Sequence, residues 1–325
     1  MVFWLLWSVY ADQDVALCDL VAATNVGDVY YPNWSCLNSI PTSNVCNWNG
    51  AGCNNNFDIV ELLLSNSILL GSIPSTIGQL HQLSILGLYG SFTGIIPTSI
   101  GTMSGLSDLG LYGSFTGTIP TSISALSGLT YLGLVGSFTG TIPSSIGTVS
   151  GLTYLDVEGS FTGTIPTGIV SAMSGLASLG LEGSFTGPIP ANIFTISGLN
   201  YIGLVGSFTG TIPTSISTMS GLTVIGLAGS FSGTIPTSIS TMSGLSILGL
   251  SGSFSGTIPT SISTMNGLTV LSLYGSFTGT IPTVFGQLSQ LHLLRYSSPY
   301  TTGNIPTEIG YLSNLILLDL SGNPL

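Results

Sequence analysis

Hydrophobic residues recur along most of this chain with a fixed period. The unit at 126 to 148 reads "LSGLTYLGLVGSFTGTIPSSIGT". Its apolar positions are Leu126, Leu129, Leu132, Leu134, Phe138, Ile142 and Ile146. Alternate residues of an extended segment point to opposite faces, so Leu132 and Leu134 share one face. The "LGL" segment therefore predicts a short β-strand with one buried face in each unit.

An Ile-Pro pair marks the period. Pro74, Pro97, Pro120, Pro143 and Pro166 follow one another at steps of 23 residues, and the series continues to Pro306 with two steps of 24. Eleven such units indicate a solenoid, in which each unit buries its apolar face against its neighbours. The stacked strands are then expected to form a parallel sheet.

The repeat resembles the leucine-rich repeat family in its plant-type form, L-x-x-L-x-x-L-x-L-x-x-N-x-L-x-G-x-I-P, over roughly residues 58 to 325. The segment "CNWNGAGC" at 46 to 53 is similar to the family's cap motif C-x-W-x-G-x-x-C, and "ALCDLVAATN" at 16 to 25 resembles its capping helix. The resemblance implies an α/β fold: a right-handed solenoid with a curved parallel sheet on the concave side and 3₁₀ or short helical turns and loops on the convex side. We expect a signal-like segment at 1–11, a cap at 12–57 and the solenoid at 58–325 without a clear C-terminal cap.

Most units depart from the family pattern at one position. The asparagine that would bond backbone groups of neighbouring units stands in register only at Asn323. In the 23-residue units "LGLYGSFTG" is one residue shorter than the family's "LxLxxNxLxG". We expect Gly-Ser to close a tight turn there, and a phenylalanine column to fill the core beneath it. The column comprises Phe92, Phe115, Phe138, Phe161, Phe185, Phe208, Phe231, Phe254 and Phe277.

Charge is nearly absent from the chain. Arg295 is its only Lys or Arg residue, and twelve acidic residues give a net charge of -11. No basic patch can form, which excludes nucleic acid as a partner. With charged residues at 4% and a mean hydropathy of +0.62, the lone molecule needs hydroxyls, glycans or self-association to stay soluble.

The first segment, "MVFWLLWSVYA", resembles a signal-peptide core ending before Asp12. It predicts secretion, although the run lacks a basic start and retention is the alternative. It is too short to span a bilayer, and no later segment is long enough.

The four cysteines lie within the first 53 residues, as expected of a cap in an oxidising compartment. We expect the disulfides Cys18–Cys36 and Cys46–Cys53; a zinc site is the rival interpretation, disfavoured because no histidine lies near. Asn33 in "NWS" is the only N-glycosylation sequon.

The outward strand positions carry a glycine column flanked by small, apolar and tyrosine residues. These positions predict a shallow, uncharged trough that suits a sugar chain, an extended peptide or another copy of the protein. The alternative is that the tyrosines only reflect strand propensity. The expected interaction surface comprises Tyr89, Tyr112, Tyr131, Tyr154, Tyr201 and Tyr274 together with Asp156, Glu158 and Glu182.

The three acidic residues of this surface form a predicted cluster, since Glu182 follows Asp156 and Glu158 by one unit. Their carboxylates suit Ca²⁺ or a general acid/base pair, and the simple alternative is solvated charge. Other chemistry fails: His81 and His292 are about nine units apart, and a chain without lysine has no P-loop. We therefore expect no enzyme activity and no cofactor.

Outward threonines form a second repeated feature. In "FTGT" the phenylalanine points inward, so the threonines on either side of the glycine point out. Such rows resemble the ice-contacting faces of repetitive antifreeze proteins, some of which are leucine-rich repeats, although the plant-type pattern commonly carries Ser or Thr here. The predicted columns comprise Thr116, Thr118, Thr139, Thr141, Thr162, Thr164, Thr209 and Thr211.

These features predict a secreted, non-enzymatic scaffold. Near-identical units without charge favour self-assembly into a fibril or surface coat, with a homo-oligomer or filament as the expected state. The alternatives are an ice-binding protein that acts through the threonine columns and an extracellular module that recognises a protein or glycan.

Overall fold

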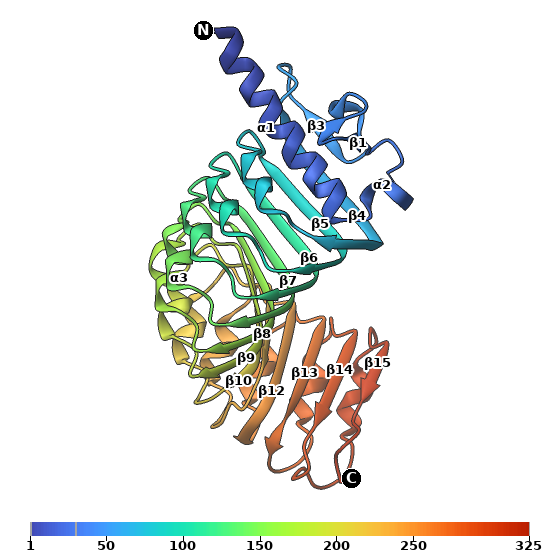
Figure 1. Ribbon diagram of the computed structural model, residues 1–325. Helices are drawn as coiled ribbons and strands as arrows, with labels where there is room; N and C mark the ends of the chain where they lie inside the picture. Colours follow the sequence, from blue (N-terminus) through green and yellow to red (C-terminus); the bar gives the residue numbers. More distant parts are fainter. Residues whose placement is uncertain (1, 30, 325) are drawn as a thin grey trace. The chain divides into compact units, whose positions relative to one another are not determined.

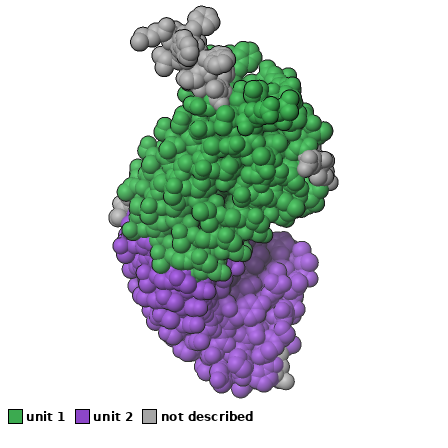
Figure 2. Space-filling view, viewed as in Figure 1, with its two compact units in different colours: residues 1–161, 171–173 green, residues 162–170, 174–325 purple. Residues whose placement is uncertain are grey.

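A computed structural model describes residues 2–29 and 31–324, and the side chains at 2–11, 28–29 and 170–172 lie outside this description. The chain forms two compact units (Figure 2). The first comprises residues 1–161 and 171–173, and the second comprises 162–170 and 174–325.

The first unit begins with a cap of short elements and continues into repeats of one strand and one 3₁₀ turn. The cap elements are α1 (Val2–Ala23), α2 (Val26–Val29), β1 (Cys36–Leu37), β2 (Ile40–Pro41), η1 (Val45–Asn47) and β3 (Ala51–Cys53). The repeats contain β4 (Ile59–Ser72), η2 (Ser75–Gln79), β5 (Ile85–Gly94), η3 (Thr98–Thr102), β6 (Asp108–Gly117), η4 (Thr121–Ala125), β7 (Tyr131–Gly140), η5 (Ser144–Thr148) and β8 (Tyr154–Gly163).

The second unit repeats the same alternation. Its elements are α3 (Thr167–Ala172), β9 (Ser178–Gly187), η6 (Ala191–Thr195), β10 (Tyr201–Phe208), η7 (Thr214–Thr218), β11 (Val224–Ala228), η8 (Thr237–Thr241), β12 (Ile247–Gly256), η9 (Thr260–Thr264), β13 (Val270–Phe277), η10 (Thr283–Gln287), β14 (Leu293–Ser297), η11 (Thr307–Tyr311) and β15 (Leu317–Asp319). Within each unit the repeat strands are parallel and pair in sequence order (Figure 1). The predicted parallel repeat fold is confirmed.

Most strands are longer than the "LxL" pattern predicts. In β6, the register with β7 shifts after Tyr112 and resumes with Thr116 opposite Ser137. The segment expected to be a tight Gly-Ser turn is therefore a second stretch of strand, and that prediction is wrong. The glycine of Gly-Ser is needed for space, because a Cβ on Gly136 would lie 3.1 Å from the Phe115 carbonyl oxygen. The left-handed backbone falls on the next glycine, with φ 79° at Gly140.

The phenylalanine column is core, as predicted. All nine rings are fully buried at 0% exposure. In the first unit Phe92, Phe115 and Phe138 stack with ring centroids 6.2 and 6.1 Å apart. Tyr296 extends the column in the second unit, 5.8 Å from Phe277, with its hydroxyl 3.0 Å from that of Thr301. The sequence pattern missed this position because the column there contains a tyrosine.

A hydroxyl ladder connects neighbouring units where the asparagines are missing. In several repeats, the serine or threonine just before the strand donates from its hydroxyl to the carbonyl of the corresponding residue one unit earlier. Ser107 Oγ lies 3.0 Å from Ser84 O, Thr130 Oγ1 3.2 Å from Ser107 O, and Thr153 Oγ1 3.1 Å from Thr130 O. Serine and threonine thus supply inter-unit bonds that the sequence analysis did not anticipate.

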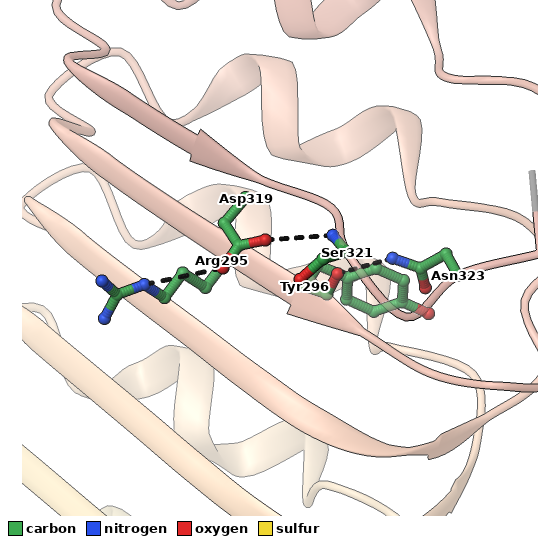
Figure 3. Close-up of polar contacts among 5 residues, drawn as sticks. All are labelled: Arg295, Tyr296, Asp319, Ser321 and Asn323. Carbon is green, nitrogen blue, oxygen red and sulfur yellow. Dashed lines mark hydrogen bonds and ion pairs between the residues drawn. The ribbon is translucent and has the colours of Figure 1, made fainter.

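Asn323 makes the bonds expected of the family asparagine (Figure 3). Its Nδ2 donates to the Tyr296 carbonyl at 2.7 Å, and its Oδ1 accepts from the Ser298 N–H at 2.9 Å. Arg295 lies nearby and forms a 4.0 Å ion pair with Asp319 (Figure 3). Hydrogen bonds from Ser321, with a smaller contribution from Arg295, lower the pKa of the Asp319 carboxyl.

Two disulfides close the cap. Cys18 is bonded to Cys36 and Cys46 to Cys53, so the predicted pairing is confirmed and the zinc interpretation is wrong. Trp34 and Trp48 are buried beside them, with ring centroids 4.7 Å apart. The predicted capping helix is the C-terminal half of α1.

The signal-like segment 1–11 includes the first turns of α1 from Val2, and its side chains lie outside the described residues. No helix in the described part of the chain has the length and apolar character needed to cross a membrane.

Candidate functional site

Four of the predicted tyrosines form a continuous row in the first unit. Tyr89 stacks on Tyr112 with ring centroids 4.9 Å apart, and Tyr131 stacks on Tyr154 at 4.5 Å. The Tyr112 and Tyr131 hydroxyl oxygens lie 2.7 Å apart and join the two pairs. Tyr89 and Tyr112 directly follow the "LxL" segments of their strands, whereas Tyr131 and Tyr154 directly precede theirs. The row therefore runs obliquely across the strands. These stacked pairs are more than strand propensity requires.

The tyrosine side chains cover the glycine column in this unit. A Cβ on Gly110 would lie 2.7 Å from the Tyr89 hydroxyl oxygen, and a Cβ on Gly133 would overlap that of Tyr112. Glycine is needed here so that a neighbouring ring can lie across the strand. In this part of the first unit, tyrosine rings therefore cover the glycine column, and the use of this face as an interaction surface stays a prediction.

Part of the glycine column in the second unit is not covered by side chains. Tyr201 covers Gly203, but no atom lies within 4 Å of a Cβ placed on Gly226, and only strand backbone lies near one placed on Gly249. Tyr201 and Tyr274, on β10 and β13, are 41% and 36% exposed. The glycine column is therefore uncovered at Gly226 and Gly249, and an interaction trough at this place stays a prediction.

Two tyrosines of the row have a raised pKa. Burial, the hydrogen bond with Tyr131 and the neighbouring Tyr131, Tyr154 and Asp156 raise the pKa of Tyr112 far above its ordinary value. Burial, Tyr131 and Asp108 also raise the pKa of Tyr89. The row presents hydrogen-bonding groups without charge.

The predicted acidic cluster divides between the two units. Asp156 and Glu158 lie on β8 of the first unit, and the Tyr154 hydroxyl lies 3.5 Å from Asp156 Oδ2. Glu182 is exposed on β9 of the second unit. No group of three or more His, Cys, Asp or Glu residues in the described part of the chain is arranged to hold a metal ion. A cation site at these three residues stays a prediction.

The predicted threonines are exposed, and some of their side chains lie close to the backbone of the neighbouring unit. The first threonine of a pair can hydrogen-bond to the preceding unit. Thr139 Oγ1, for example, donates to the Gly117 carbonyl at 3.4 Å. The second threonine of a pair points its methyl group toward the positive-φ glycine of the following unit. A Cβ built on Gly140 would lie 2.9 Å from Thr118 Cγ2. The same 2.9 Å approach joins Thr211 to Gly233 in the second unit. All eight predicted threonines are exposed: Thr116, Thr118, Thr139, Thr141, Thr162, Thr164, Thr209 and Thr211.

The remaining predicted residues lie apart from these surfaces. Asn33 is partly buried, and its Nδ2 donates to the Asn47 carbonyl at 2.6 Å. His81 is exposed in the first unit, and His292, in the second, lies 2.8 Å from the Gln290 carbonyl through Nδ1. The sequence analysis missed Asn25, whose side chain bonds Leu70 N–H at 2.7 Å and the Ile68 carbonyl at 3.0 Å. A hydrogen-bonding side chain directly after the cap helix was the available signal.

Comparison with known proteins places this geometry in a class. No family model matches the chain. A probable leucine-rich repeat receptor-like serine/threonine-protein kinase of Arabidopsis thaliana is 51% identical over 41 residues, which are 13% of this chain and 5% of that protein. The chain therefore spans only a small part of this curated relative.

Solved structures match over nearly the whole chain. The ectodomain of the Arabidopsis receptor kinase HAESA, in complex with an N-terminally extended IDA peptide hormone ligand, has a TM-score of 0.80 at 27% identity, covering 96% of this chain and 53% of that one. A TDR receptor has a TM-score of 0.75 at 30% identity, with 81% and 47% covered. The chain spans about half the length of these receptor structures.

A plant ice-binding protein is similar along both chains. Its TM-score is 0.65 at 22% identity, covering 97% of this chain and 96% of that one, a likeness of fold alone. The strand and 3₁₀ alternation thus defines a solenoid of the kind found in extracellular receptor ectodomains. The chain is a plant-type leucine-rich repeat protein.

Proposed function

We propose that this protein is an extracellular, non-enzymatic scaffold that binds ice through its threonine columns. The observation that carries the proposal is the exposed Thr-Gly-Thr pair, which is repeated in successive units, with some of its side chains close to the backbone of the neighbouring unit. Each threonine offers one methyl and one hydroxyl group in a repeating position. Ice is periodic and uncharged, and a chain with charged residues at 4% suits it.

Restricted side-chain positions favour this activity, because an ice surface does not change its shape to fit the protein. Threonine is stiff at χ1, and its packing against the next glycine restricts it further. A surface that is ordered before contact loses less conformational entropy on binding. The fold is compatible with this activity, since a plant ice-binding protein shares it over 97% of this chain.

Thermal hysteresis of the purified protein tests the proposal. Tyrosine in place of Thr118, Thr141 and Thr164 should remove at least half of the hysteresis, because bulky rings interrupt the second column. The matched control places tyrosine at Thr121, Ser144 and Thr167, which are exposed at the same spacing after the Ile-Pro pair. Absence of hysteresis in the parent protein, or equal loss in both variants, would contradict ice binding.

Recognition of an extended, uncharged partner is the second candidate. The open stretch at Gly226 and Gly249 between Tyr201 and Tyr274 favours it. The HAESA structure, which contains a peptide hormone, supplies a relative of the same fold. Arginine in place of Gly226 should block such a partner while leaving thermal hysteresis unchanged.

Self-assembly, the first expectation from the sequence, is a prediction without support from the comparisons. Sedimentation at high protein concentration tests it. A homogeneous monomer would exclude a fibril or coat, and concentration-dependent growth would support one.

A further inference from the structure

We propose that the cap contains a separate binding site for a lysine or arginine side chain of a partner polypeptide, held by Asp14. This site, here named the cap hollow, has a volume of about 230 Å³ and is lined by Gln13, Asp14, Ile40, Pro41, Val45 and Phe57, among others. It lies in the first unit, and its function does not depend on ice binding.

Asp14 supplies an uncompensated negative charge. Burial raises the pKa of its carboxyl, and no described residue forms a hydrogen bond or ion pair with it. The neighbouring Gln13 amide is already used: Nε2 donates to the Phe57 carbonyl and Oε1 accepts from the Ile59 N–H, both at 3.2 Å. The first unit contains no Lys or Arg, since Arg295 is the only such residue of the chain. A lysine or arginine side chain that pairs with Asp14 would therefore come from another molecule.

The lining of the cap hollow is mixed, with the polar residues Gln13, Asp14, Ser43 and Asn44 beside exposed apolar side chains. Ile40 and Phe57 are 64% and 60% exposed, and Leu37, the strand partner of Ile40, is 69% exposed. Val45, also in the lining, is buried. Large apolar side chains this exposed and this close together are typical of a contact surface.

Phe57, one of the lining residues, has a strained backbone, and two further positive φ values lie in the turn between β1 and β2. Asn38, Ser39 and Phe57 have φ values of 52°, 60° and 64°, and they are the only non-glycine residues with positive φ in the described chain. All three lie in the cap, and Phe57 is a bulky residue for which this region is a genuine outlier. The Gln13 bond to the Phe57 carbonyl maintains this conformation while the ring stays exposed. Strain of this kind clusters at ligand-binding positions.

The chemistry of the cap hollow fits a long basic side chain. A lysine or arginine stem is aliphatic and can pack between Ile40 and Phe57, while its head reaches a carboxylate at the base. Partial burial strengthens the attraction between the two charges. A metal ion fits poorly because it requires several oxygen ligands, and the hollow offers one carboxylate.

Two synthetic peptides test the proposal on the full chain by chemical-shift titration. One is acetyl-Leu-Lys-Leu-amide, and the other has norleucine, which keeps the aliphatic stem and lacks the charge. We expect the lysine peptide to bind at least about tenfold more tightly, with shifts centred on Asp14, Ile40 and Phe57. The Asp14→Asn variant should abolish this preference. The control Asp12→Asn removes the same charge two residues away, at a different hollow beside His81, and should preserve the preference.

The outcomes distinguish binding at Asp14 from nonspecific attraction to a negatively charged protein and from misfolding of the variants. Equal affinity for the two peptides, no binding, or equal loss in both Asp variants would overturn the proposal. Phe57→Gly tolerates the same backbone and should weaken both peptides alike, because it removes a wall and leaves the charge. Unchanged unfolding midpoints would show that the variants fold, and thermal hysteresis should be unaffected in all of them.

Discussion

The hydroxyl oxygens of Tyr112 and Tyr131 lie 2.7 Å apart, and their hydrogen bond joins two stacked tyrosine pairs. Tyr112 comes from β6 and Tyr131 from β7, so the contact connects consecutive repeats across the glycine column. The row is therefore part of the fold as well as a candidate contact surface. The predictions below separate these roles.

Loss of the Tyr112 hydroxyl should weaken the fold modestly. Tyr112→Phe leaves the Tyr131 hydroxyl without its partner and should lower the free energy of unfolding by about 1 kcal/mol. Urea denaturation measures the change. Tyr274→Phe is the control, because no hydrogen bond of that exposed hydroxyl is found in the described chain, and it should be neutral. A neutral Tyr112→Phe would show that water replaces the bond without cost.

Glycines of the same column should differ in their tolerance of a methyl group. Gly133→Ala places a Cβ against the Tyr112 and Tyr131 hydroxyls and should destabilise the fold by about 1–3 kcal/mol. Gly226→Ala meets no atom within 4 Å and should be neutral, or stabilising by up to about 1 kcal/mol through unfolded-state entropy. Equal effects at the two sites, measured by thermal unfolding, would contradict the role assigned to tyrosine.

Asn323 should hold the last repeats together. Asn323→Ala removes the bonds to the Tyr296 carbonyl and the Ser298 N–H and should cost about 1–2 kcal/mol of local stability. Amide hydrogen exchange at Ser298 should accelerate while exchange at Leu132 in the first unit stays unchanged. Protection that persists at Ser298 would assign its stability to the surrounding packing.

The Asp14 carboxyl should make stability depend on pH in one direction. Its pKa is raised by burial, so the folded state binds this proton more tightly than the unfolded state does. Between the ordinary aspartate pKa and the raised value, this group therefore makes stability increase as the pH falls. Above the raised pKa, the buried charge carries a constant penalty.

The Asp14→Asn variant should remove this dependence and be at least as stable as the parent at neutral pH. Urea midpoints across the acid range measure both effects, and Asp12→Asn again serves as the control. A variant less stable than the parent at neutral pH would show that Asp14 has a stabilising partner when folded.

The sequence predicted the architecture because the repeat determines it. Leu132, Leu134 and Phe138 recur every 23 residues, so each unit buries the same side chains against its neighbours. The disulfide pairing and the Asn323 bonds were likewise predicted. The prediction of a tight Gly-Ser turn was wrong. Gly136 does not have a positive φ, and the strand continues beyond it after a shift in register.

By itself, then, the sequence determined the repeat, the buried phenylalanine column, the exposed threonine pairs and the near absence of charge, all of which follow from local alternation and composition. Only the tertiary structure decided that tyrosine side chains cover Gly110 and Gly133 in the first unit, whereas Gly226 in the second unit is uncovered. It also decided that Asp14, Ile40 and Phe57 enclose one hollow. These arrangements depend on contacts between different strands and loops, and the direction of a side chain across such contacts is set by packing, which periodicity along one chain does not encode.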